Sequence, residues 1–418
     1  MTRPRAVFVI TGSELVRGER TDLNGPFLAR EALSLGLEPA RILIVGDREE
    51  ELEDALRLGF DADLCVTSGG LGPTHDDRTI ELVARVAGVP LELRQDLHEE
   101  ISGISRAFAE RMRRPYADFE EGVRKQATLP VGALSLGLAG TAPGSVLDTT
   151  ETVVVVLPGP PQELQRLWPR ALETEPVRRV LELAQPPQRR ILRFFGASES
   201  AIARALREAG GEREGVETTI CARDFEIHVD LVVQPGFEAV ADELEAGLVA
   251  PVEQYLFSRD ERMVEELVLD LCRAAGLTLG TAESCTGGLV AARLTGVPGA
   301  SDVFGGGVVA YSNAVKQAEL GVSAETLREH GAVSRETALA MAEGARERLG
   351  VDVAVSVTGI AGPDGGTAEK PVGLVHLAAV GPGGPVAHEF NLPGDRATIR
   401  ARATVMALHL LRRLLAQS

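Results

Sequence analysis

Short apolar runs and amphipathic segments alternate over the first 170 residues of the chain. The apolar runs predict buried strands, at residues 6–10, 41–45, 64–67 and 153–157. The segments between them have helical periodicity, at residues 23–35, 49–58 and 79–87. Strands and helices in alternation are typical of a doubly wound sheet with parallel strands. We therefore expect residues 1–170 to form an α/β domain.

The pattern changes after a stretch rich in Pro and Arg at residues 169–189, which indicates a domain boundary. The next segment predicts strand, helix, two strands and a long helix, at residues 191–195, 199–209, 216–221, 225–233 and from 238 onward. This order predicts a small α+β domain of KH type over residues 171–255. The GxxG loop with which a KH domain clamps nucleic acid is missing. A spacer or a dimerisation element is therefore favoured, and we expect a homodimer.

Beyond residue 260 the alternation of strands and helices resumes. Strands are predicted at residues 277–279, 308–311, 353–357 and 372–379. Helices are predicted at residues 335–349 and from 397 onward. We expect a second α/β domain over residues 256–418.

The net charge narrows the choice of partners. The chain has 418 residues and a formal net charge of −18 at pH 7, with 44% hydrophobic and 25% charged residues. Its length exceeds the size at which one core keeps growing, which is consistent with two or three domains. Binding to a phosphate backbone depends on clustered Lys and Arg. We therefore expect small-molecule partners and no direct contact with nucleic acid.

The cysteines and the lengths of the apolar segments argue against a zinc-binding, disulfide-linked or membrane protein. Cys65, Cys221, Cys272 and Cys285 are far apart and form no CxxC pair, which predicts neither a zinc site nor a disulfide framework. No apolar stretch has the length of a membrane span. The apolar run at 6–10 is too short for a signal peptide. We expect a cytoplasmic protein without a membrane partner.

A nucleophile is predicted after the strand at 277–279, in the sequence Ala-Glu-Ser-Cys-Thr-Gly-Gly at 282–288. Glycines expose main-chain N–H groups, which suit an oxyanion hole or a phosphate cradle, beside the hydroxyl of Ser284. Tyr311 and Lys316 supply the phenol and the amine that serine nucleophiles use without histidine. This combination predicts acyl-type hydrolysis without a metal or other cofactor. The alternatives are an ordinary helix cap with a surface lysine, or Cys285 as the nucleophile.

A second candidate site lies at residues 68–77. The N–H groups of Gly69, Gly70 and Gly72 and the dipole of the following helix favour a phosphate. Asp76 and Asp77 would repel that phosphate unless a divalent cation bridges them. The segment therefore predicts a metal and a phosphate together. Alternatively, the two aspartates are only favourable charges at a helix start.

Both segments carry a resemblance to one family. The sequence Ser-Gly-Gly-Leu-Gly-Pro at 68–73 with Asp76 and Asp77, preceded by Gly46-Asp47, resembles the ligand loop of the molybdopterin-binding MoaB/Mog family. The variant Gly-Leu-Gly-Pro-Thr-His-Asp-Asp, with the segment at 157–164, is similar to the CinA branch. The C-terminal motifs resemble the nicotinamide mononucleotide deamidase domain of that family, at residues 282–288, 305–307, 311–316 and 358–363. The resemblance covers essentially the whole chain.

For the first domain, the CinA resemblance implies a metal-dependent pyrophosphatase that splits ADP-ribose into AMP and ribose 5-phosphate. The divalent metal, Mg, Mn or Co, would be held by the catalytic carboxylates and their neighbours, Asp76, Asp77, Glu14 and Asp47, with Glu163 near the metal or its water. The substrate-binding residues would be Ser68, Gly69, Gly70, Gly72, Asn24, Gly159 and Pro160. Asn24 would hold ribose or phosphate.

For the last domain, the resemblance implies hydrolysis of nicotinamide mononucleotide to nicotinate mononucleotide and ammonia. Ser284 would be the nucleophile and Lys316 its uncharged base, with Tyr311 as relay or orienting group. The amides of Thr286, Gly287 and Gly288 would hold the oxyanion or the 5′-phosphate. Substrate contacts would also come from a second glycine loop and the last helix, at Thr358, Gly359, Arg396 and Arg400. The two arginines, four residues apart, would clamp a phosphate or pair with surface carboxylates.

Two alternatives to this bifunctional hydrolase stay open. The first domain could keep a molybdopterin-type ligand. The chain could also act mainly as a regulatory or adaptor protein in competence and DNA-damage responses, through a protein partner.

Overall fold

The structure is a computed structural model that describes residues 3–140 and 142–416. Contacts divide the chain into two compact units. The first comprises Met1–Gln188 with Val233–Glu238, and the second comprises Arg189–Val232 with Ala239–Ser418. Each unit is described by itself below. Within the described residues, no helix is long and apolar enough to cross a membrane.

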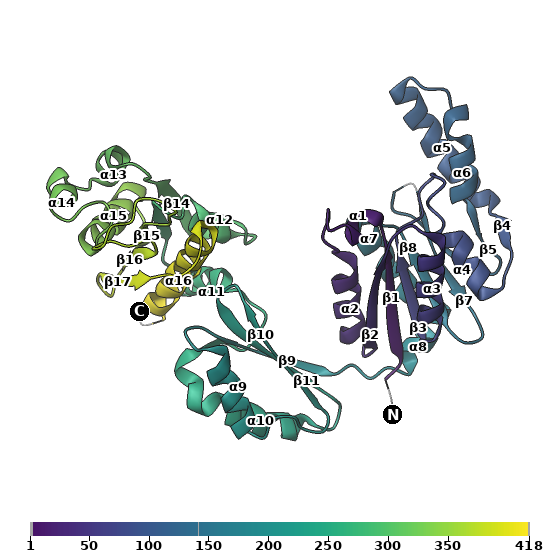
Figure 1. Cartoon of the computed structure of the whole chain (residues 1–418), viewed down its shortest axis with the longest axis horizontal. Coiled ribbons are helices and arrows are strands. Elements are labelled where there is room, and N and C mark those ends of the chain that lie inside the picture. The colour runs from purple at the N-terminus through teal and green to yellow at the C-terminus, as the bar shows by residue number, and fades with distance from the viewer. Residues whose placement is uncertain (1–2, 141, 417–418) are drawn as a thin grey trace. The chain divides into compact units, whose positions relative to one another are not determined.

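A six-stranded sheet forms the centre of the first unit (Figure 1). Its order is β2 (Glu38–Val45), β1 (Arg5–Thr11), β3 (Leu64–Ser68), β8 (Val153–Leu157), β7 (Pro143–Asp148) and β6 (Leu134–Leu138). The first four strands are parallel, and β7 and β6 are antiparallel to their neighbours. The expected doubly wound α/β domain is therefore confirmed, with an antiparallel edge that was not expected.

Helices cover both faces of this sheet, which is why its central strands β3 and β8 are buried along their whole length. The helices are α1 (Ser13–Val16), α2 (Asn24–Ser34), α3 (Glu49–Phe60), α4 (Thr79–Ala87), α5 (Gln95–Met112), α6 (Ala117–Gln126), α7 (Pro161–Leu172) and α8 (Glu175–Glu182). Outside the main sheet, strand β4 (Leu91–Leu93) pairs with strand β5 (Thr128–Pro130). Val7 and Val9 of β1 belong to the core with α3 and α4, whereas Phe8 and Ile10 belong to the core with α2 and α7.

This unit differs from the expected domain in its C-terminal limit and in two of its strands. Val177 of α8 belongs to the core of the first sheet, so the unit continues to Gln188, whereas the sequence placed a boundary after residue 170. Strands β6 and β7 were not expected because Gly137, Pro143 and Gly144 disfavour strands in a sequence-based prediction.

The second unit begins with a four-stranded sheet of order β10, β11, β9 and β12. Its elements are β9 (Gln188–Phe194), α9 (Glu199–Glu208), β10 (Val216–Arg223), β11 (Glu226–Val233), α10 (Glu238–Val249), the 3₁₀ helix η1 (Ala250–Tyr255) and β12 (Leu256–Ser258). This order of strands and helices agrees with the one expected for the middle domain.

A five-stranded sheet forms the rest of the second unit, in the order β14, β13, β15, β16 and β17. The strands are β13 (Leu279–Glu283), β14 (Phe304–Val309), β15 (Val353–Gly359), β16 (Leu374–Val380) and β17 (Val386–Asn391). The helices are α11 (Val264–Ala275), α12 (Leu289–Thr295), η2 (Ala300–Asp302), α13 (Asn313–Leu320), α14 (Ala324–Glu329), α15 (Arg335–Leu349) and α16 (Arg396–Leu415). Strand β13 runs parallel to both β14 and β15.

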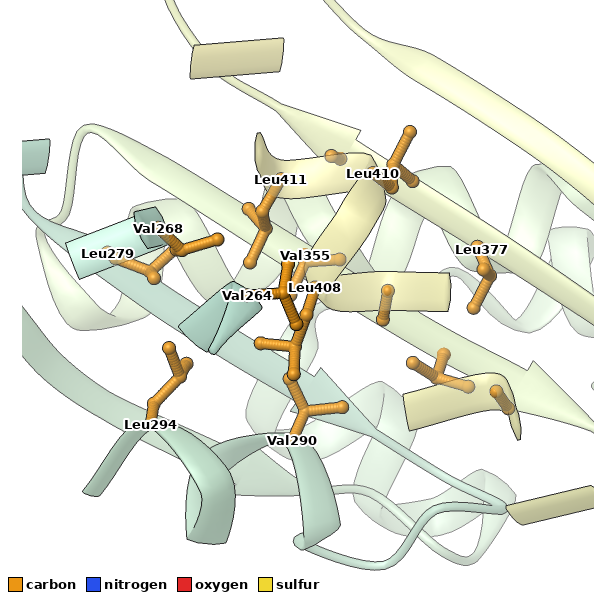
Figure 2. Close-up of a cluster of buried hydrophobic side chains, with 14 of the residues drawn as sticks. Val264, Val268, Leu279, Val290, Leu294, Val355, Leu377, Leu408, Leu410 and Leu411 are labelled. Carbon is orange, nitrogen blue, oxygen red and sulfur yellow. The ribbon is translucent and has the colours of Figure 1, made fainter. Parts of the chain in front are cut away.

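Two cores hold this second sheet. Figure 2 shows the larger one, to which Val268 of α11, Leu294 of α12, Leu411 of α16 and Val355 of β15 all belong. The other core lies against α15 and includes Met341. Because both faces are covered, the loops at the carboxyl ends of β13 and β15 are the places where a ligand can reach the sheet.

Candidate active sites

The structure brings Ser284 and Lys316 together. Ser284 directly follows β13, and Lys316 lies in the first turns of α13, which the Ser312 side chain caps. Lys316 Nζ lies 3.0 Å from Ser284 Oγ and donates a hydrogen bond of 2.8 Å to the carbonyl oxygen of Ala310. The side chain of Lys316 is 1% exposed. A serine hydroxyl and a buried amine therefore face each other, as a serine–lysine dyad requires.

Burial prepares the amine for the role of a base. Desolvation lowers the pKa of Lys316 below its usual 10.5, with a small opposing influence from Cys285. A neutral amine has two N–H bonds and one lone pair. One N–H is fixed on the Ala310 carbonyl, which leaves the lone pair available to accept the proton of Ser284.

Cys285 is a weaker candidate for the nucleophile. Its side chain is buried, and this burial raises its pKa to about 11, only partly offset by main-chain amides. The thiol therefore stays protonated near neutral pH, and the thiolate is the reactive form of cysteine. This favours Ser284 over Cys285.

The glycine loop after Ser284 is organised differently from the expectation. Gly287 N donates to the carbonyl of Ser284, and Gly288 N donates to Glu283 Oε2 at 2.9 Å. The buried carboxylate of Glu283 also accepts from the first amides of α12, at Val290 and Ala291. The expectation that Gly287 and Gly288 hold an oxyanion or a phosphate is therefore wrong, because Glu283 already occupies the anion-binding end of the helix.

Two amides of the loop stay available. Within the described residues, the N–H groups of Cys285 and Thr286 have no oxygen acceptor; they face the sulfur of Cys285 and lower its pKa. A protonated thiol is a weak acceptor, so both amides can still bind an oxyanion. They follow Ser284 directly. Donors at this place can stabilise the oxyanion of the tetrahedral intermediate that forms when Ser284 attacks a carbonyl carbon. Of the three amides predicted to bind an anion, only that of Thr286 therefore fits, joined by that of Cys285.

The two arginines of α16 have separate roles. Arg400 donates to the carbonyls of Cys285 and Thr286 at 3.0 and 2.8 Å, so it braces the nucleophile loop, and it does not line the cavity beside Ser284. Arg396 donates to the carbonyl of Gly362 at 2.7 Å and to the hydroxyl of Tyr311 at 3.0 Å. The Tyr311 side chain is 63% exposed, and its hydrogen bond is to Arg396 rather than to Lys316. Tyr311 and Arg396 therefore lie at the mouth of the site.

A cavity of about 180 Å³ adjoins the dyad. Its lining includes Ser284, Lys316, Thr358, Gly359, Tyr311 and Arg396, so six of the predicted residues meet there. Thr358 donates its hydroxyl to the carbonyl of Ala332 at 2.7 Å. The rest of the lining is small or apolar, with Cys285, Ala332, Val333 and Ala361. Such a lining suits the flat face of a ring.

A larger cavity of about 630 Å³ lies at the carboxyl ends of β1, β3 and β8 in the first unit. Every residue predicted for the first site lines it, at Glu14, Asn24, Asp47, Ser68, Gly69, Gly70, Gly72, Asp76, Asp77, Gly159, Pro160 and Glu163. The sequence reasoning missed Arg20 and Asp22, which also line it and follow no strand or glycine motif.

The glycines of this loop are required by close packing. Gly69 and Gly70 have φ angles of 103° and 65°, and a Cβ on Gly70 would lie 2.2 Å from Thr79 Oγ1. Gly69 N donates to the carbonyl of Leu157, so the expected phosphate contact of this amide is taken. The amides of Gly70 and Gly72 have no oxygen acceptor within the described residues.

The donor set of the large cavity fits a cation together with an anion. Its lining carries the carboxylates of Glu14, Asp22, Asp47, Asp76, Asp77 and Glu163. Among the described lining residues, Arg20 is the only basic one. An anionic ligand would be repelled by these carboxylates unless a divalent cation accompanied it. The residues present therefore fit a divalent metal.

The carboxylates do not form a cage by themselves. In the part of the chain that the structure describes, no group of three or more His, Cys, Asp or Glu side chains is placed to hold a metal ion. Asp47 accepts hydrogen bonds from Thr11 and Ser13, and a hydrogen bond from the Thr74 hydroxyl lowers the pKa of Asp76. A cation held by one or two carboxylates and by the phosphates of a ligand is the arrangement that magnesium prefers.

Asn24 and Glu163 stand out in this cavity. Asn24 Nδ2 donates to Ser68 Oγ and to the carbonyl of Gly159, whereas its Oδ1 is buried without a partner in the described residues. A buried acceptor of this kind needs a donor from a ligand or a water. Burial raises the pKa of Glu163, partly offset by Arg166, which brings this carboxyl closer to the range of a proton acceptor and donor.

Two family profiles match the chain. The "Probable molybdopterin binding domain" matches residues 7–176, and the "CinA C-terminal domain" matches residues 261–415. The fold and these matches therefore identify the protein as one in which a MoaB/Mog-like domain precedes a CinA C-terminal domain.

Relatives that match over the full length of the chain show its family. A CinA-like protein of Mycolicibacterium paratuberculosis is 44% identical over 429 residues, covering 98% of both chains. A CinA-like protein of Mycobacterium tuberculosis is 43% identical over 423 residues, covering 98% of this chain and 97% of the relative. The chain belongs to the CinA-like family.

Among solved structures, the competence/damage inducible protein CihA from Agrobacterium tumefaciens is 47% identical. It covers 38% of this chain and 100% of its own, with a TM-score of 0.36. The protein CinA from Thermoplasma acidophilum is 29% identical and covers 42% of this chain and 98% of its own, also with a TM-score of 0.36.

Proposed function

We propose that the second unit hydrolyses the carboxamide of nicotinamide mononucleotide to a carboxylic acid and ammonia. One observation carries this proposal: the Ser284 hydroxyl lies 3.0 Å from the buried amine of Lys316, at the wall of a small cavity. The resemblance of the surrounding motifs to a deamidase domain supplies the substrate. A hydroxyl and a desolvated amine in contact are the parts that amide hydrolysis needs in the absence of histidine.

The reaction follows from the positions of these groups. Lys316 Nζ takes the proton of Ser284, and the seryl oxygen attacks the carboxamide carbon. The amides of Cys285 and Thr286 stabilise the oxyanion of the tetrahedral intermediate. The protonated Lys316 then gives its proton to the leaving nitrogen, and ammonia departs as the seryl ester forms. Lys316 next takes a proton from water, the hydroxide opens the ester, and Ser284 regains its proton.

The size of the cavity decides how the substrate enters. About 180 Å³ is smaller than the usual ligand pocket of about 300–1,000 Å³, so the ring that bears the carboxamide enters and the remainder stays outside. The ribose phosphate then extends toward Tyr311 and Arg396 at the mouth. Arg396 is the cation that meets the phosphate there.

The test is ammonia release from nicotinamide mononucleotide by the whole chain and by single variants. We expect Ser284→Ala to abolish release and Cys285→Ala to leave most of it. Loss of activity only in the Cys285 variant would move the nucleophile to the thiol. No release by the unaltered chain would refute the proposal, and a partner-binding role in competence or DNA-damage responses would then be favoured.

We also propose that the first unit hydrolyses the diphosphate of ADP-ribose to AMP and ribose 5-phosphate. The supporting observation is a large cavity that combines carboxylates with the unengaged amides of Gly70 and Gly72. Asp76 and Asp77, with Glu14 and Asp47 nearby, are the residues that would hold Mg²⁺, Mn²⁺ or Co²⁺. Such an ion, when bound, neutralises the diphosphate and polarises it toward water.

The chain itself contributes orientation and proton transfer in this site. Asn24 Oδ1 accepts a hydroxyl donor of the ribose, and the amides of Gly70 and Gly72 bind phosphate oxygens. Glu163 accepts the proton of the attacking water.

The test of this second activity is AMP formation from ADP-ribose with each of the three metals and with a chelator. We expect AMP with at least one metal and none with chelator, and Asp76→Asn should abolish it. No AMP under any metal would refute the proposal. A molybdopterin-type ligand bound by the first unit would then be the better explanation.

A further inference from the structure

One wall of the Ser284 cavity is an irregular segment that side chains hold in place. Ala332 and Val333 line the cavity and lie between α14 and α15, outside any helix or strand. An irregular segment has no ladder of main-chain hydrogen bonds to position it, so its groups must find other partners. The position of this wall therefore depends on the side chains that bind its carbonyls.

Four consecutive carbonyls of this segment each accept a hydrogen bond from a side chain. The carbonyls of His330 and Val333 both accept from Lys370 Nζ, each at 2.7 Å. The carbonyl of Gly331 accepts from the hydroxyl of Thr337, and that of Ala332 accepts from Thr358, both also at 2.7 Å. A single ammonium thus joins the two ends of the wall. Hydrogen bonds from a charged donor are the stronger kind.

Lys370 lies in a loop that main-chain hydrogen bonds hold in place. The loop between β15 and β16 is closed at its base by hydrogen bonds between Ile360 and Leu374 and between Gly373 and Ile360, at 2.9 and 2.8 Å. Within the loop, Lys370 N donates to Thr367 Oγ1 at 3.0 Å, and Thr367 N donates to the carbonyl of Lys370 at 2.8 Å. The main chain of Lys370 is therefore fixed before its side chain reaches the wall.

The chain contains few lysines, and two of them lie beside the Ser284 cavity. Its only lysines are Lys125, Lys316 and Lys370, among 43 basic residues of Lys and Arg. Two of these three amines bind carbonyls around one cavity, although Lys370 itself does not line it. A compact ammonium with three donors can bind two carbonyls at once and still face water.

We propose that Lys370 is a positioning residue for the deamidation proposed above, on which this inference rests. It holds the wall through the carbonyls of His330 and Val333, on either side of Ala332, at the distance from Ser284 that the carboxamide-bearing ring requires, and it does so without touching the substrate. Removing its ammonium releases two carbonyls and lets the wall move. Ser284 and Lys316 are held by other contacts, with Val357 and Ala310, and keep their geometry.

The expected effect is therefore on binding rather than on chemistry. Lys370→Met removes two hydrogen bonds from a charged donor, and only part of that loss reaches the substrate. We expect Lys370→Met to raise KM for nicotinamide mononucleotide about tenfold, equal to about 1.4 kcal/mol, with kcat changed less than about twofold. Lys370→Arg, whose guanidinium can also bind two carbonyls, should recover part of the loss.

The matched control is Arg348→Met. Arg348 pairs with Glu319 at 3.1 Å on the surface of the same unit and lies outside the cavity lining. The variants are compared by steady-state ammonia release, and binding is measured separately by calorimetry of nicotinamide mononucleotide with Ser284→Ala and with the Ser284→Ala, Lys370→Met double variant. Lys370→Gln replaces Lys370→Met if the latter does not fold.

The outcomes separate this inference from the proposed function. A raised KM and a weakened Kd with Lys370→Met, recovered by Lys370→Arg and absent in Arg348→Met, support it. Unchanged KM and Kd, or a fall in kcat alone, overturn it while leaving the deamidase intact. No ammonia release by the unaltered chain overturns both.

Discussion

Replacing the buried amine of Lys316 should remove activity and also change how stability depends on pH. Lys316→Met keeps the length and the apolar stem of the side chain but removes the group that accepts the proton of Ser284. General base catalysis typically contributes about 10²–10⁴-fold. We therefore expect ammonia release to fall by that factor, which corresponds to about 3–5 kcal/mol of lost transition-state stabilisation.

The pH dependence follows from the lowered pKa of the same amine. Burial lowers the pKa of Lys316 in the folded chain below 10.5, its ordinary value in the unfolded chain. Between these two values the unfolded chain binds a proton that the folded chain lacks, so folding becomes more favourable as pH rises through this window. The Met variant lacks this dependence. The stability of Lys316→Met relative to the unaltered chain should therefore fall with rising pH, by at most about 1.4 kcal/mol per pH unit.

The assay combines two measurements on the whole chain. Activity is measured as ammonia release from pH 6 to about pH 10, because the unprotonated base is the active form and the rate should rise through the lowered pKa. Stability is measured by hydrogen exchange of peptides from β13 and α13, at several pH values after correction for intrinsic exchange. Trp168 is the only tryptophan and is buried in the first unit, so its fluorescence in urea serves as the internal control.

Two results would refute this reasoning. Activity of Lys316→Met within about tenfold of the unaltered chain would show that the amine is not the base. A stability difference that stays constant, or grows in favour of the variant, as pH rises toward 10.5 would show that burial does not lower the pKa of Lys316. An unchanged unfolding transition of Trp168 is required for either conclusion.

Three further predictions use other features of the two sites. In a chain labelled with ¹³C at the ε carbons of its lysines, the signal lost in Lys316→Met should titrate with a midpoint below 10.5, and a midpoint at or above 10.5 would contradict the burial effect. Glu283→Gln should slow deamidation about 10–100-fold and loosen α12, because three main-chain donors lose their charged acceptor; a normal rate would show that the carboxylate does not position Ser284. Gly70→Ala should destabilise the first unit by about 1–3 kcal/mol in urea and abolish AMP formation, since its Cβ meets Thr79 at a φ of 65°, whereas unchanged stability would contradict the packing of that loop.

The architecture of the first unit could largely be predicted from the sequence. The apolar runs that became β1, β2, β3 and β8 are buried on both faces or follow the sheet period, which is a local property of the residues. Because parallel strands end at one edge of a sheet, the polar residues after each strand could also be assigned to one cavity, and they do line it. The strands β6 and β7 were not predicted, because glycine and proline disfavour strands.

The chemistry of the second unit could be predicted only in part. Ser284 and Lys316 were assigned from residue types that suit a nucleophile and a base, and the structure brings them within 3.0 Å. The roles of Gly287 and Arg400 were mistaken, because the partner of an amide or a guanidinium is decided by whichever acceptor the fold brings nearest. For Arg400 these acceptors are carbonyls more than a hundred residues away in the chain.

The sequence alone thus determined most of the parallel strands and their helices, and which residues have the chemistry for a site, since periodicity and side-chain type are local properties. Only the tertiary structure decided that Glu283 fills the end of α12 and that Lys370 holds the wall beside Ser284. Burial and hydrogen-bond partners, and with them the lowered pKa of Lys316, arise from contacts between residues far apart in the chain. No local pattern encodes such contacts.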